Sequence, residues 1–240
     1  MRSGVGARVF HYRNSRGLSM NYTWDFSAVL RNSDLLIQGA IGTFKLAAVS
    51  CLLAIPIGLL VAVMRMSNSR FLANAAACYV NVFRASAALV LLFWFYFAFP
   101  ILAGVNMEPY TAAVAAITLQ CGAYFAEVFR GGIASIHRGQ WEAAKAIGLN
   151  YRASMRYVIL PQAAKRMLPI FFTRVIELIK TTALAGAIAY GDLLYSAARV
   201  VSITFRPIET YTIVALTFFI IIFTMSQAVR LLERRLAVSN

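Results

Sequence analysis

Residues able to carry covalent or metal chemistry are sparse in this chain, and none stands in a catalytic arrangement. His11 and His137 have no carboxylate or cysteine companions, and Cys51, Cys78 and Cys121 lie in apolar surroundings without a Cys-x-x-Cys pair. No Gly-x-x-x-x-Gly-Lys-Ser/Thr string occurs, so a phosphate-binding loop is not expected. We therefore expect no enzyme activity, no cofactor and no metal site, with the cysteines acting as small buried apolar residues.

The polar residues are instead concentrated in one basic segment, Ala126 to Arg166. Seven of its residues are Lys or Arg, against the two acids Glu127 and Glu142. Because Lys and Arg resist transfer across a bilayer, this segment is predicted to be cytoplasmic. A loop of this length with helix signals of its own is typical of a docking surface for a soluble partner. The alternative is a solvated face that only orients the protein in the membrane.

Local signals within this segment predict two short helices joined by a tight turn. Gln140–Ile147 consists mostly of strong helix formers, and Gly148 follows where a left-handed C-cap is favoured. Asn150 is suited to cap a second helix over Tyr151–Leu160, which Pro161 is expected to end. The result is a compact knob that exposes Glu142, Lys145 and Arg152.

The elements that position this knob belong to an integral membrane protein. The 240 residues fit one domain, and 60% of them are hydrophobic while only 13% are charged. The net charge of +14 could suggest a nucleic-acid partner. However, the charges sit in loops and at the ends of apolar runs, so membrane orientation explains them and no nucleic acid is expected.

Five apolar runs predict five transmembrane helices in an all-α fold, because a helix needs about 20 apolar residues to cross a bilayer. The runs are Leu46–Met64 (extended upstream by Leu35–Phe44), Ala85–Met107, Pro109–Ala126, Met167–Tyr190 and Thr210–Val229. An amphipathic helix over Ser69–Phe83 is expected to lead into the second. Basic residues follow the first, third and fifth runs, which predicts an outside N-terminus and an inside C-terminus.

The fourth run is interrupted by Arg174, Glu177 and Lys180. Ionisable groups within a membrane are costly and tend to face a cavity or a partner. Glu177 and Lys180 therefore have two interpretations. They line a substrate path and contact a zwitterionic head group, or they form an internal ion pair or an interfacial anchor.

The first nineteen residues are polar and basic and lack the apolar core of a signal peptide. An outside N-terminus would place their four arginines against the positive-inside tendency. We interpret residues 1–19 as a non-native or disordered extension, with translation starting at Met20, and residues 20–240 as the transmembrane domain.

The knob and the helix before it carry a specific resemblance. Gln140–Leu149, QWEAAKAIGL, followed by Val158–Ala163, VILPQA, resembles the EAA loop of ABC importer permeases. Gly122–Ile133, GAYFAEVFRGGI, is similar to the polar amino-acid branch, whose members take up histidine, glutamine, arginine or opines. The resemblance covers Asn21 to the C-terminus.

The resemblance implies a permease subunit of an ATP-driven importer in a bacterial inner membrane. Two permease subunits, identical or different, form the path, and a periplasmic binding protein delivers the amino acid. Each loop docks as a coupling helix into a cleft on a cytoplasmic ATPase dimer. On this chain the coupling residues would be Gly139, Glu142, Ala143, Ala144, Lys145, Gly148, Asn150 and Arg152. Glu142 would make a polar contact, Gly148 would permit the bend, and Ala143 and Ala144 would allow close approach.

The chain departs from the branch pattern at 180–184, a mild change, and more clearly at 85–87, and two rival functions stay open. The branch commonly has Gly-Thr-Pro where this chain has Ala85-Ser86-Ala87, which predicts a straighter start to the second span. A self-contained channel or secondary carrier, or a scaffold that recruits a cytoplasmic partner, would use the same apolar runs. Flux that depends on ATP and an ATPase subunit separates the importer from both.

Overall fold

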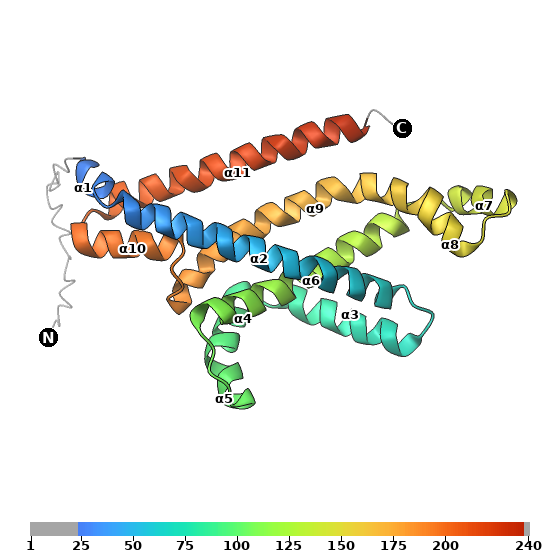
Figure 1. Ribbon diagram of the computed structural model, residues 1–240, viewed down its shortest axis with the longest axis horizontal. Helices are drawn as coiled ribbons and strands as arrows, with labels where there is room; N and C mark the ends of the chain where they lie inside the picture. Colours follow the sequence, from blue (N-terminus) through green and yellow to red (C-terminus); the bar gives the residue numbers. More distant parts are fainter. Residues whose placement is uncertain (1–23, 238–240) are drawn as a thin grey trace, which may run out of the picture.

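The computed structural model describes residues 24–237, in which long helices lie roughly along one axis (Figure 1). The short α7 and α8 lie at one end of this axis, whereas α1 and α10 lie at the other. The predicted extension over residues 1–19, the start at Met20 and His11 fall outside the described residues.

Helices account for nearly all of this part of the chain, which confirms the all-α prediction. In chain order they are α1 (Ser27–Leu30), α2 (Ser33–Arg65), α3 (Arg70–Ala85), α4 (Ala88–Phe93), a π-helix (Trp94–Ala98), α5 (Phe99–Ala103), α6 (Pro109–Ala134), α7 (Arg138–Ala146), α8 (Tyr151–Ser154), a second π-helix (Met155–Ile159), α9 (Leu160–Thr182), a 3-10 helix (Ala183–Ile188), α10 (Leu193–Thr204) and α11 (Pro207–Ala237).

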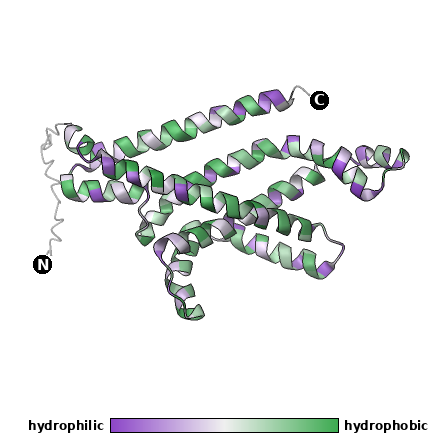
Figure 2. Ribbon diagram, viewed as in Figure 1, coloured by the Kyte–Doolittle hydropathy of each residue, from purple (hydrophilic) through white to green (hydrophobic). Residues whose placement is uncertain are grey.

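Within residues 24–237, three helices are long and apolar enough to cross a membrane, namely α2, α6 and α11. A fourth crossing is added if α3 and the segment Ala88–Ala103 together form one bent span. The charged α9 does not meet this test of apolar length. Figure 2 shows apolar residues along α2 and α11 and polar residues at the α7–α8 end. The chain is therefore a multi-pass membrane protein, while five spans and their orientation stay predictions.

The core forms where α2 packs against α6. Leu46 and Ala54 of α2 and Ile117 of α6 are buried in one cluster, with Phe125 fully enclosed. The approach is close at Gly58, where a Cβ atom would lie 2.6 Å from the Cβ of Phe125. Because only glycine fits there, the two helices are fixed at one crossing point.

The three cysteines differ in how deeply they are buried. Cys121 is buried, Cys51 is half-buried and Cys78 is exposed on α3. The prediction that all three are buried is therefore wrong for Cys78. Apolar neighbours in a sequence do not distinguish a protein interior from a surface that faces lipid.

The prediction of a straighter second span is also wrong, because the chain bends by 104° between α3 and α4. Ser86 and Ala87 are both extended, with φ of −76° and −69°. These angles are available to any residue, so the bend needs neither glycine nor proline. A hydrogen bond from α6 stabilises the bend: the Nε2 atom of Gln120 donates to the Ser86 carbonyl oxygen at 2.9 Å.

Pro161 does not end the helix before it, which corrects the predicted boundary. The chain continues from α8 through the π-helix into α9, where Pro161 occupies the first turn. The Leu160 N–H bonds to the Met155 carbonyl five residues back. A proline normally clashes with the carbonyl four residues earlier, and the wider π turn relieves this crowding. The first π-helix, Trp94–Ala98, likewise lies just before Phe99-Pro100.

Candidate functional site

Local backbone chemistry shapes the knob formed by α7 and α8, residues 137–159. The Nδ1 atom of His137 accepts from the Gly139 N–H at 3.1 Å and caps α7. Gly148 has φ +80°, as expected for a left-handed C-cap. The Asn150 side chain accepts from the Ala153 N–H at 2.9 Å and caps α8. The predicted turn and the Asn150 cap are therefore confirmed, although the second helix continues past Pro161 into α9.

The knob has a small interior of its own. Ala144 is 2% exposed, and Ile136 and Ile159 are buried in one apolar cluster, against which Trp141 packs. Trp141 stacks on Tyr151 with ring centroids 5.7 Å apart. Ala144 therefore allows α7 to approach the rest of the knob and leaves its outer surface to other residues.

The outer surface of the knob carries the other predicted coupling residues. Glu142, Ala143 and Lys145 are exposed on α7, and Arg152 is exposed on α8. Ile147 is 75% exposed beside them. Glu142 makes no ion pair with any residue in the described part of the chain. This surface therefore offers unpaired charge and an apolar side chain to a partner.

An ion-pair network that the sequence did not reveal joins α2 and α6 near the knob. The Glu127 carboxylate accepts from Arg65 at 2.7 Å and from Arg130 at 2.8 Å. Glu127 had been predicted to lie in the loop, but α6 continues for two more turns to Ala134. Its side chain is only 19% exposed, so the network fixes the end of α6 that leads into the knob.

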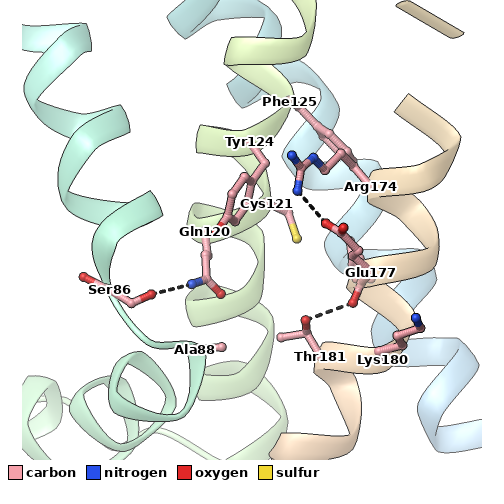
Figure 3. A pocket seen from close by; sticks show the side chains of 11 residues that line it. Ser86, Ala88, Gln120, Cys121, Tyr124, Phe125, Arg174, Glu177, Lys180 and Thr181 are labelled. Carbon is pink, nitrogen blue, oxygen red and sulfur yellow. Dashed lines mark hydrogen bonds and ion pairs between the residues drawn. The ribbon is translucent and has the colours of Figure 1, made fainter. Parts of the chain in front are cut away.

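A cavity of about 400 Å³ lies between α3, α4, α6 and α9 (Figure 3). We call it the outer cavity. Glu177 and Lys180, the predicted path residues, both line it, together with Gln120, Tyr124 and Arg174. The remaining lining residues are Ser86, Ala88, Cys121, Phe125, Leu178 and Thr181.

The charged residues of the outer cavity are paired only in part. Arg174 pairs with Glu177 at 2.6 Å, and its guanidinium lies 5.0 Å from the Tyr124 ring centroid. Lys180 makes no ion pair within the described residues. Arg174 and Lys180 against Glu177 leave the lining with one surplus positive charge. The cavity thus presents a cation and a carboxylate side by side, which suits a ligand that carries both charges.

Gln120 and Tyr124 were missed as cavity residues. Both lie on α6 at helical spacing, within a run that reads as apolar. A glutamine within a transmembrane segment is itself a signal, because buried amides need hydrogen-bond partners. Within residues 24–237 no group of three or more His, Cys, Asp or Glu is placed to hold a metal ion.

Comparison with known proteins gives consistent matches across the chain. Residues 54–238 match the family described as binding-protein-dependent transport system inner membrane component. The glutamine transport system permease protein GlnP of Escherichia coli K12 is 35% identical over 216 residues, covering 90% of this chain and 99% of that protein. The arginine transport system permease protein ArtQ of Bacillus subtilis 168 is 31% identical, covering 88% and 97%.

A solved structure matches as well. It is described as the crystal structure of an amino acid ABC transporter with histidines, and its matching chain is 35% identical to this one. The TM-score is 0.85, and the match covers 89% of this chain and 100% of that chain.

Proposed function

Because the chain belongs to the family of binding-protein-dependent transport system inner membrane components, we propose that it is the permease subunit of an ATP-driven importer for polar amino acids or related opines. Permeases of this kind move substrate and are transport components rather than enzymes. The family implies an ATPase and a binding protein as partners. The rival functions, a self-contained carrier and a recruiting scaffold, would leave this family membership unexplained.

The knob is the proposed contact with a cytoplasmic ATPase dimer. Its exposed surface combines Glu142, Lys145 and Arg152 with the apolar Ile147. A matching cleft would have an apolar floor for Ile147 and polar groups around its rim. Gly139, Gly148 and Asn150 would act through the shape of the knob, since each sits at a cap or turn. Ala143 is exposed and would allow close approach, whereas Ala144 supports the knob from inside.

Five spans, with the N-terminus outside and the knob inside, are the proposed topology. In this arrangement α2, α6 and α11 cross the membrane, the bent pair of α3 and α4–α5 forms the second span, and α9 forms the fourth. The charges of α9 are compatible with this assignment, because Arg174, Glu177 and Lys180 line a cavity. A bacterial inner membrane is the location that the family description implies.

The outer cavity is the proposed substrate path, with a second permease subunit, identical or different, completing it. Its volume of about 400 Å³ lies within the range of about 300–1,000 Å³ usual for small-ligand sites. Lys180 would bind the substrate carboxylate, and Glu177 would bind the ammonium group when its pair with Arg174 opens. The exposed apolar residues of the α4–α5 arm, among them Phe97 and Ile101, would contact the second subunit.

The observation that carries the proposal is the exposed, well-capped knob at the end of an amino-acid permease fold. The test is ATP-driven uptake of radiolabelled glutamine, glutamate, arginine and histidine into proteoliposomes containing the permease, its ATPase and its binding protein. Uptake should require all three components and should disappear when Gly139–Asn150 is deleted. Equal uptake without the ATPase would instead establish a self-contained carrier.

A further inference from the structure

A second cavity lies further along α6 toward the knob, and we call it the inner cavity. Its volume is about 180 Å³, and it is lined by Arg84, Tyr124, Glu127, Val128, Gly131, Gly132, Ile170 and Arg174. Tyr124 and Arg174 line the outer cavity as well. The two cavities are therefore neighbours that share one aromatic ring and one guanidinium.

Tyr124 lies between two cations at this boundary. The Arg174 guanidinium is 5.0 Å from the ring centroid, and the Arg84 guanidinium is 5.7 Å from it. Both distances fall within the range of about 6 Å for cation–π attraction. A carboxylate in the outer cavity thus has a second guanidinium, that of Arg84, on the other side of one ring.

The charge balance of the inner cavity leaves Arg84 without a paired carboxylate. Glu127 already accepts from Arg65 and Arg130, and Glu177 already accepts from Arg174. Arg84 makes no ion pair with any residue of the described chain. A guanidinium is less strongly hydrated than an ammonium and binds a carboxylate through two parallel hydrogen bonds, so it suits a site that is partly desolvated.

We propose that the inner cavity is a second binding station for the amino-acid carboxylate, with Arg84 as its anchor and Tyr124 and Arg174 as the boundary between the two stations. The inference rests on the substrate path proposed above. A volume of about 180 Å³ fits a head group, whereas the outer cavity has room for a side chain as well. The phosphate of an anionic lipid has similar chemistry, and the experiment distinguishes the two sources.

The experiment places one reporter cysteine in each cavity of the complete transporter, in a background without Cys51, Cys78 and Cys121. Ala88→Cys reports on the outer cavity, and Gly131→Cys reports on the inner cavity, since a Cβ atom on Gly131 would meet nothing within 4 Å. The transporter is held in phosphatidylcholine nanodiscs. Maleimide labelling is timed with L-glutamine, L-glutamate, L-arginine, or 4-aminobutanamide, which is glutamine without its carboxylate.

The proposal predicts that at least one amino acid slows labelling at both reporters, and that 4-aminobutanamide does not slow it at the inner one. Arg84→Gln should weaken inner protection roughly tenfold, the loss expected for one charge-assisted contact, and leave outer protection unchanged. Arg84→Lys should retain most of the protection at the inner reporter. Arg70→Gln is the matched control, because Arg70 starts the same helix and lines neither cavity.

Each contrary outcome has a distinct meaning. Protection of the outer reporter Ala88→Cys alone would contradict the second binding station but not the proposed function. Protection at neither reporter, together with a lack of ATP-driven uptake, would overturn the proposed substrate path and the station with it. Slower labelling of Gly131→Cys on adding phosphatidylglycerol, without any amino acid, would assign the inner cavity to a lipid and contradict the proposal.

Discussion

Gly148 determines the turn between α7 and α8 through its backbone angle and not through lack of space. Its φ is +80°, and a Cβ atom there would meet nothing within 4 Å. A side chain would therefore fit sterically against its neighbours but would strain the backbone, at a cost of about 1–2 kcal/mol, more for a β-branched residue. The shape of the knob depends on this one angle.

Gly148→Val should therefore weaken co-purification of the ATPase at least several-fold, while Gly148→Asn should weaken it less because asparagine tolerates the left-handed region. Quantitative co-purification from detergent measures the effect. Gly104→Val is the matched control, since Gly104 has φ +67° and equally open surroundings but lies at the end of α5. An equal loss with both variants would show a general effect of strain and contradict the role of the knob.

Glu142 should contribute to ATPase binding through its charge. It is exposed and unpaired within the described chain, so nothing in the knob depends on it for folding. Glu142→Lys should weaken ATPase binding several-fold at low salt, and the difference from wild type should narrow as salt screens the charge. Glu108→Lys, a reversal at an exposed site before α6, is the control. Wild-type affinity of the Glu142 variant at every salt concentration would exclude this contact.

At the scale of elements, Glu127 joins the ends of α2 and α6. Glu127→Gln would leave Arg65 and Arg130 without their carboxylate in a half-buried position, and should cost about 1–3 kcal/mol. Thermal unfolding in detergent should show a lower Tm. Glu177→Gln breaks a more exposed pair and should cost less than about 1 kcal/mol. A larger loss from the Glu177 variant would contradict this ranking by burial.

The knob could be predicted from local sequence signals, whereas contacts between distant parts of the chain could not. Gly148 and Asn150 act on their immediate neighbours, so residue type and spacing sufficed to predict the turn and the second cap. The bend at Ser86 is held by Gln120 of another helix, and no local pattern shows that contact. Pro161 was misassigned because the sequence rule assumes an α turn before the proline, and the chain forms a π turn there.

The charged cavity was predictable only at the level of single residues. Arg174, Glu177 and Lys180 are conspicuous in an apolar run, which drew attention to α9. Their shared cavity depends on where α6 and α3 pack, and Tyr124, Gln120 and Arg84 enter the lining through that packing. The hydropathy pattern therefore identified α9, whereas the residues that share its cavities are known only from the tertiary structure.

For the whole molecule, the proposed topology predicts which segments can be labelled from each side of the membrane. A single cysteine in place of Glu108, in a background without native cysteines, should react with a membrane-impermeant maleimide in intact spheroplasts. A cysteine in place of Lys145 on the knob should react only after lysis or in inverted vesicles. Labelling of the Lys145 position from outside would reverse the orientation and remove the knob from any cytoplasmic ATPase.

The most direct test of the account is a pull-down from detergent-solubilised membranes with tagged wild-type protein and a variant lacking Gly139–Asn150, followed by mass spectrometry of the bound proteins. We expect wild type to retain a soluble ATPase and a permease subunit, and the deleted variant to lose the ATPase while it still inserts into the membrane. An ATPase that binds both proteins equally would contradict the docking role of the knob. The absence of any ATPase from intact wild-type protein would contradict the importer assignment itself.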